Sequence, residues 1–196
     1  IELAASQIEQ SNPRQILTAL QRDITELATD LYDVPAEHRS IRTVLDQSWK
    51  LLNEAEMKAL ALCTVFQYRF SAEAAASVLD RSDYLQLLQN LVDKSWLNTE
   101  FSGMQREFTM HAIVRDYGSQ KLINMGIETK YNTHQRHCDY YLHFVSLLET
   151  SMSSARMHQL LTSIRQELAN VQSAWRWAVL QGQYELISRS CIALCD

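Results

Sequence analysis

The residues best placed for chemistry lie where an alternating pattern of apolar and polar residues gives way to a helical one. Residues 106–117 read REFTMHAIVRDY. The alternation up to Met110 predicts a half-buried strand, and the later spacing predicts a helix whose inner face holds Ile113, Val114 and Tyr117. His111 lies at the junction, where backbone N–H groups and the positive end of the helix dipole can bind a phosphate. A histidine packed in the core is the alternative interpretation.

The sequence lacks the glycine-rich loops that bind phosphates. It has only four glycines, and none belongs to a G-x-x-x-x-G-K-[ST] or G-x-G-x-x-G sequence. No Ser/His/Asp or Cys/His combination has a supporting sequence context either. We therefore expect no catalytic residue in this segment and no cofactor held by it alone, so that the segment is not an enzyme.

His134, His137, Cys138 and His143 form a second group of candidate ligands. His134 and Cys138 are four residues apart on a predicted helix, a spacing that can chelate zinc. Cys138, however, shares a packing stripe with Tyr141, and no second pair of ligands follows. Core packing and solvated histidines are the preferred interpretation, and we expect no metal.

Composition restricts the class of protein. The 196 residues carry a net charge of −5, which gives no reason to expect nucleic acid or an anionic membrane as a partner. The four cysteines form no C-x-x-C pair, and the sequence shows neither a signal peptide nor an apolar run of membrane-spanning length. We expect a cytoplasmic protein, and because the chain begins in mid-helix we expect it to be part of a longer polypeptide.

The scarcity of glycine and proline predicts long helices in the first half of the chain. Apolar stripes predict amphipathic helices at residues 1–10, 13–27 and 40–52. Trp49 lies on the widest of these stripes and is expected to be buried. Asn53 and Glu56 predict a capping box, and Ser71 and Asp83 predict the starts of two further helices.

Beyond these helices the period of the pattern changes from 3.6 to 2. Ser95–Phe101 and Met104–Met110 flank Ser102-Gly103, which predicts a β-hairpin with a tight turn. Three helices, a hairpin and the helix from His111 make the order of a winged-helix domain. The helix before the hairpin, Ser82–Lys94, carries two aspartates and one lysine, whereas DNA readers cluster lysine and arginine. This charge favours a winged helix that contacts protein.

From Glu128 onwards the pattern is helical again. Two further stripes consist of His137, Tyr141, Val145 and Leu148, and of Leu160, Ile164, Leu168, Val171, Trp175 and Ala178. Antiparallel helix pairs of this kind begin α-solenoid repeats. The predicted fold is mainly α: a helical bundle plus a winged-helix domain with one β-hairpin, followed by α-solenoid-like helices. The predicted domains are residues 1–52, 53–125 and 126–196.

Five segments carry a resemblance to a known family. In chain order they are LAAS (Leu3–Ser6), VPAEHRSIRTVLDQSW (Val34–Trp49), LVDKS (Leu91–Ser95), MHAIVRDY (Met110–Tyr117) and ELANVQSAWRWAVLQG (Glu167–Gly182). Together they resemble the STAND class of signalling NTPases, and are most similar to large bacterial transcription regulators with an NB-ARC-type switch. The resemblance covers nearly the whole chain.

The resemblance implies a role for each segment. Residues 1–52 would end the helical domain of the NTPase switch, 53–125 would be its winged-helix domain, and 126–196 would begin a TPR-like sensor region. The expected partners are an upstream P-loop domain that binds ADP or ATP and the C-terminal sensor repeats, with oligomerisation on activation and no direct contact with nucleic acid or membrane. His111 would match the histidine of the family's M-H-D motif, which contacts the β-phosphate of ADP. Ala112 stands where the family has aspartate.

The resulting hypothesis is a non-catalytic regulatory relay in transcription regulation. It would couple the nucleotide state of the upstream P-loop domain to the C-terminal helical sensor. The alternative is a free-standing winged-helix DNA-binding domain with a helical dimerisation tail. A scaffold built only of solenoid helices is a third interpretation, which a real hairpin before Met110 would exclude.

Overall fold

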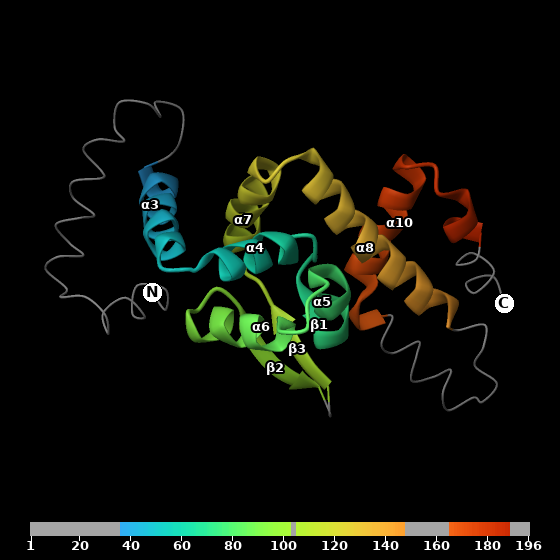
Figure 1. The fold of residues 1–196 in the computed structure, drawn as a ribbon, viewed down its shortest axis with the longest axis horizontal. Coiled ribbons are helices and arrows are strands. Elements are labelled where there is room, and N and C mark those ends of the chain that lie inside the picture. The colour runs from blue at the N-terminus through green and yellow to red at the C-terminus, as the bar shows by residue number, and fades with distance from the viewer. Residues whose placement is uncertain (1–35, 103–104, 148–164, 189–196) are drawn as a thin grey trace, which may run out of the picture.

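The described chain consists of packed helices with a small antiparallel sheet (Figure 1). The computed structural model describes residues 36–102, 105–147 and 165–188. The helices predicted at residues 1–10 and 13–27 lie outside these ranges, as do Leu148, Leu160 and Ile164. The elements, in chain order, are α3 (Ala36–Lys50), α4 (Glu54–Cys63), β1 (Arg69–Ser71), α5 (Ala72–Leu79), α6 (Tyr84–Asp93), β2 (Asn98–Ser102), β3 (Gln105–Thr109), α7 (Ala112–Asn124), α8 (Ile127–Ser146) and α10 (Leu168–Leu180). The mainly helical class predicted from the sequence is confirmed.

Side chains that bond to exposed backbone N–H groups define where the helices begin. The capping box predicted at α4 is confirmed, because Asn53 Oδ1 accepts from the Glu56 N–H at 2.9 Å and Glu56 Oε2 accepts from the Asn53 N–H at 2.9 Å. Ser71 caps α5 as predicted. Helix α6 begins after Asp83 as predicted, but the Asp83 carboxylate binds Arg81 at 2.8 Å and makes no capping hydrogen bond to the helix. A two-pronged ion pair with a nearby arginine competes well with a single cap.

The sheet has the strand order β1-β3-β2, with both pairs antiparallel. The hairpin predicted before Met110 is confirmed, although its strands are shorter than predicted and residues 103–104 of its turn lie outside the described ranges. Strand β1 was not predicted, because three residues are too few to show an alternating pattern. Its central residue Phe70 is fully buried and pairs with Phe108, with 5.8 Å between the ring centres.

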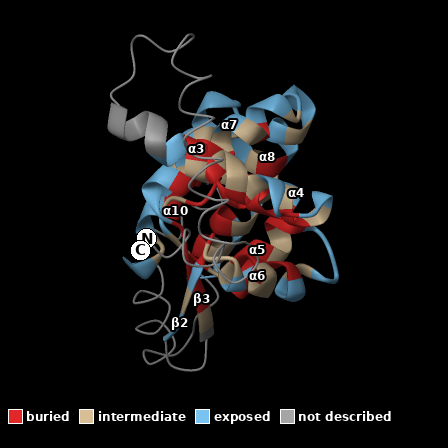
Figure 2. Ribbon diagram, turned by 90° about the vertical axis from the view of Figure 1, so that its left-hand side faces the viewer, coloured by how far each residue is buried: buried red, intermediate tan, exposed pale blue. Residues whose placement is uncertain are grey.

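The core runs continuously through the helices, with buried residues on their inner faces and exposed residues outside (Figure 2). Helix α4 contacts α5, α6 and α7, while α8 contacts α5, α7 and α10. Val114 and Tyr117 face inward from α7 as predicted, but Ile113 is 41% exposed. The α7 stripe continues instead through Gly118 and Leu122, one helical turn at a time.

Trp49 is only partly buried, contrary to the sequence-based prediction. Its ring meets Trp96 and Tyr117 edge-on, with centroid distances of 6.1 and 5.7 Å. The ammonium group of Lys121 lies 5.4 Å from the centre of the same ring. Helix α3 therefore leaves one side of this indole at the surface, where a cation rather than core atoms packs against it.

Helices α7 and α4 approach each other closely at Gly118. A Cβ atom added there would lie 2.7 Å from the Thr64 methyl carbon Cγ2, a distance at which one of the two must move. The Thr64 hydroxyl is fixed by a 2.6 Å hydrogen bond to the Ala61 carbonyl, so the threonine side chain has little freedom to turn away. Glycine at this position therefore serves close packing rather than an unusual backbone conformation.

Gly118→Ala should destabilise the protein by about 1–3 kcal/mol through this overlap, although alanine is the better helix former. Thr64→Ser removes the obstructing methyl group and keeps the hydroxyl. In the Thr64→Ser background, Gly118→Ala should therefore be neutral or stabilising. Urea unfolding of the two single variants and the double variant measures this difference, and an equal loss in both backgrounds would show that the contact does not limit packing.

Candidate functional site

The junction between β3 and α7 places His111 at the protein surface. Met110, the residue before it, is buried and donates its N–H to the Tyr68 carbonyl at 3.1 Å. His111 itself is exposed and is the N-cap of α7, with φ −65° and ψ 143°. Its ring Nδ1 accepts from the Ile113 N–H at 3.3 Å, and its carbonyl accepts from the Arg115 N–H at 2.9 Å. The predicted strand-to-helix junction at His111 is thus present.

The capping bond determines which ring nitrogen of His111 can donate. Because Nδ1 accepts a hydrogen bond, the neutral ring carries its proton on Nε2. Among the described residues none accepts from Nε2, so this N–H can donate to a group that is not part of the described chain. The neighbouring Ala112 is exposed and supplies no carboxylate. An anion near the helix start would meet a polar N–H donor and the helix dipole.

Residues 67–69 support the junction through hydrogen bonds. The Arg115 guanidinium donates through Nη1 to the Gln67 carbonyl, and the Gln67 N–H donates to Asn170 Oδ1 at 2.8 Å. Asn170 belongs to α10 and is 2% exposed. Sequence reasoning missed this residue, although an asparagine between the apolar positions Leu168 and Val171 of a predicted packing stripe was a usable signal.

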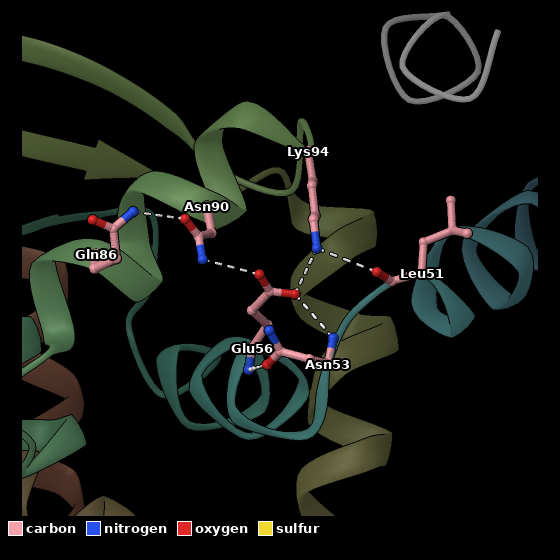
Figure 3. Close-up of polar contacts among 6 residues, drawn as sticks. All are labelled: Leu51, Asn53, Glu56, Gln86, Asn90 and Lys94. Atoms are coloured by element: carbon pink, nitrogen blue, oxygen red, sulfur yellow. Dashed lines mark hydrogen bonds and ion pairs between the residues drawn. The ribbon is translucent and has the colours of Figure 1, made fainter. Parts of the chain in front are cut away.

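The buried carboxylate of Glu56 joins the start of α4 to α6 (Figure 3). Glu56 is 2% exposed, and its Oε2 accepts from Lys94 Nζ at 2.6 Å while its Oε1 accepts from Asn90 Nδ2 at 3.1 Å. The same ammonium donates to the Leu51 carbonyl at 3.2 Å. Burial alone would raise the pKa of Glu56, but the bonds from Lys94, Asn53 and Asn90 lower it, so the group is charged at neutral pH.

The histidine and cysteine group on α8 takes part in packing. His137 and Cys138 are buried, and the His134 ring stacks on Trp177 with 4.6 Å between centroids. Burial raises the pKa of the Cys138 thiol to about 12, which keeps it protonated at neutral pH. His143 is exposed. In the described part of the chain, no group of three or more His, Cys, Asp or Glu side chains could hold a metal ion.

Cationic side chains around α6 and the hairpin have partners within the protein. Arg106 donates to Gln89, and the other contacts join Arg69 to Glu107 at 2.9 Å, Arg81 to Asp83 at 2.8 Å and Lys94 to Glu56 at 2.6 Å. A DNA phosphate would have to compete with these carboxylates and with the exposed Glu100 beside them. The charges on the surface of α6 are therefore unfavourable for binding DNA.

Comparison with known proteins identifies no relative. Neither a scan against protein-family models nor a search of curated proteins finds a match to this chain. Among the described helices, none is long and apolar enough to cross a membrane. The function is therefore inferred from the contacts of the His111 junction and of residues 67–69 and Asn170 that support it.

His137 makes the stability of the protein depend on pH. It is 1% exposed between Phe66 and Tyr141, and its Nε2 has no hydrogen-bond partner among the described residues. Burial lowers its pKa from 6.5 to about 3, which the Asn170 side chain opposes. Between these two values the unfolded chain binds a proton that the folded chain does not. Stability contributed by the neutral ring is therefore complete above pH 6.5 and is lost as the pH falls towards 3.

His137→Phe should weaken this dependence, because phenylalanine stays neutral. Between pH 7 and pH 3 the wild type should lose up to about 5 kcal/mol more of its unfolding free energy than this variant. Denaturant unfolding at several pH values tests the difference, with the exposed His143→Phe as the control that keeps the wild-type slope. Parallel pH profiles for wild type and His137→Phe would contradict the assignment.

Proposed function

We propose that this chain is the non-catalytic relay of a STAND-type signalling ATPase of the NB-ARC kind. In this proposal residues 1–52 end the helical domain of the switch, 53–125 form its winged-helix domain and 126–196 begin a TPR-like sensor region. An upstream P-loop domain binds ADP or ATP, and the relay passes its nucleotide state to the sensor. The output is transcription regulation in the cytoplasm.

The observation that carries the proposal is the position of His111. The ring is exposed, stands at the start of α7 and has Nδ1 occupied by the helix cap, which leaves Nε2–H able to donate to an acceptor outside the described residues. A β-phosphate from a neighbouring nucleotide-binding domain would fit this donor and the helix dipole together. The order α4, β1, α5, α6 and the β2–β3 hairpin supports assigning the winged-helix domain.

The mechanism is a choice between two packings of the relay. With ADP bound upstream, His111 contacts the phosphate and the winged helix stays against the nucleotide-binding domain. Exchange for ATP and binding of a sensor ligand favour the released packing, which oligomerises. A few kcal/mol of difference between the two packings is enough for such a switch.

The surface of α6 favours a protein partner over DNA. Of the nearby cations, Arg81 and Lys94 are engaged in ion pairs and Arg106 donates to Gln89, while the exposed Asp93 adds a negative charge to the polar face of the helix. The competing function, a DNA-binding winged helix with a dimerisation tail, predicts binding in a gel-shift assay that weakens steeply with salt. The relay predicts no shift in low salt.

His111→Asn separates the cap from the phosphate contact. Asparagine is a good N-cap and keeps the start of α7 intact, but its shorter side chain cannot reach where Nε2 reaches. The variant should fold with wild-type stability. In the longer polypeptide it should weaken ADP retention by about 1–3 kcal/mol, the contribution of one charge-assisted hydrogen bond.

Rates of release of a labelled ADP from wild type and His111→Asn provide the measurement. His143→Asn is the matched control, because it changes an exposed histidine on α8 that has no part in the junction. The control should release ADP at the wild-type rate. Equal rates for wild type and His111→Asn would show that His111 is a structural cap only.

A further inference from the structure

The side chain of Asn170 binds the edge of the sheet as a neighbouring strand would. Its Oδ1 accepts from the Gln67 N–H at 2.8 Å, and its Nδ2 donates to the Arg69 carbonyl at 2.6 Å. β1 is an edge strand, and these main-chain groups face away from β3. Nδ2 also donates to Glu167 Oε2 at 2.7 Å, and Glu167 accepts from the Tyr141 hydroxyl at 2.9 Å. The buried amide is thereby held in one orientation.

The opposite side of the same short segment holds the His111 junction. The Tyr68 carbonyl accepts from the Met110 N–H at 3.1 Å, and the Gln67 carbonyl accepts from the Arg115 guanidinium. Met110 precedes His111 directly, and Arg115 gives its own N–H to the His111 carbonyl at 2.9 Å. Residues 67–69 therefore lie between α10 and the start of α7, with hydrogen bonds to both.

We propose that Asn170 is a positioning residue that couples α10 to His111 through the main chain of residues 67–69. A shift of α10 moves residues 67–69. These residues in turn move Met110 and Arg115, which set the position of the His111 ring. The coupling is a property of this chain by itself. Its effect on nucleotide rests on the proposed function, in which α10 belongs to the sensor and His111 contacts ADP.

Gln183 supplies a matched control for Asn170. It joins the end of α10 to α8, because its Oε1 accepts from Gln135 Nε2 at 3.2 Å. No hydrogen bond of the described chain joins Gln183 to residues 67–69. Gln183→Ala therefore loosens α10 without cutting the proposed route, whereas Asn170→Ala removes both bonds to the edge of β1.

Amide hydrogen exchange in the 196-residue chain tests the coupling. The N–H groups of Met110 and Ile113 report on the junction. The Met110 N–H donates to the Tyr68 carbonyl, and the Ile113 N–H donates to Nδ1 of His111. In Asn170→Ala they should exchange at least about tenfold faster than in wild type, through local opening rather than global unfolding. In Gln183→Ala they should stay within about twofold of wild type. Equal changes in the two variants would overturn the proposal.

Arg115→Met tests the same route from its other end, should Asn170→Ala fold poorly. Arg115 is only partly buried, and methionine has no N–H to donate to the Gln67 carbonyl. Coupling is reciprocal, so the side-chain N–H₂ signals of Asn170 in an NMR spectrum should shift and exchange faster in this variant. Unchanged Asn170 signals would overturn the proposal.

ADP release from the longer polypeptide separates this inference from the proposed function. If both hold, Asn170→Ala and His111→Asn each speed release, and the double variant is no faster than the faster single variant. Faster exchange at Met110 in Asn170→Ala, with ADP release unchanged in both Asn170→Ala and His111→Asn, supports the coupling and rejects the nucleotide role of His111. Unchanged exchange rejects the coupling, whatever the release rate of His111→Asn.

Discussion

The buried carboxylate of Glu56 is the interaction on which the packing of the first half depends. A charge that is 2% exposed is tolerable only when its hydrogen bonds are satisfied, and here they come from the start of α4 and from Asn90 and Lys94 at the end of α6. Lys94 also bonds to Leu51, just after α3. One carboxylate thus sets the places of α3, α4 and α6, and α4 in turn carries the close contact with α7 at Gly118.

The short strand β1 is the second constraint, and it connects this core to the C-terminal helices. Its edge would expose main-chain groups that the side chain of Asn170 satisfies, while its inner side pairs with β3. A polar bond is directional in a way that apolar contact is not, so α10 has one favoured register on the sheet. The position of His111 is consequently set by residues from three parts of the chain, which suits a relay better than an isolated binding loop.

Features that depend on neighbouring residues could be predicted from the sequence, whereas contacts between residues distant in the sequence could not. The capping box at Asn53 and the hairpin before Met110 are visible in the sequence because their geometry depends on neighbours a few residues away. Asp83 shows the limit, since an arginine two residues earlier binds its carboxylate more favourably than the helix start. His111 was predicted at its junction from the change of period. The hydrogen bond between Gln67 and Asn170 that supports this junction joins residues 103 positions apart, which no local pattern encodes.

In the proposed mechanism the Nε2–H of His111 lies against a phosphate, and chemical modification of this imidazole ring tests that contact. Diethyl pyrocarbonate reacts with exposed, neutral imidazoles, so the longer polypeptide can be treated with and without ADP and each modified histidine identified by mass spectrometry. If ADP covers this nitrogen, it should slow modification of His111 many times over and leave that of the exposed His143 unchanged. Equal modification of His111 in the presence and absence of ADP would show that His111 does not contact the nucleotide.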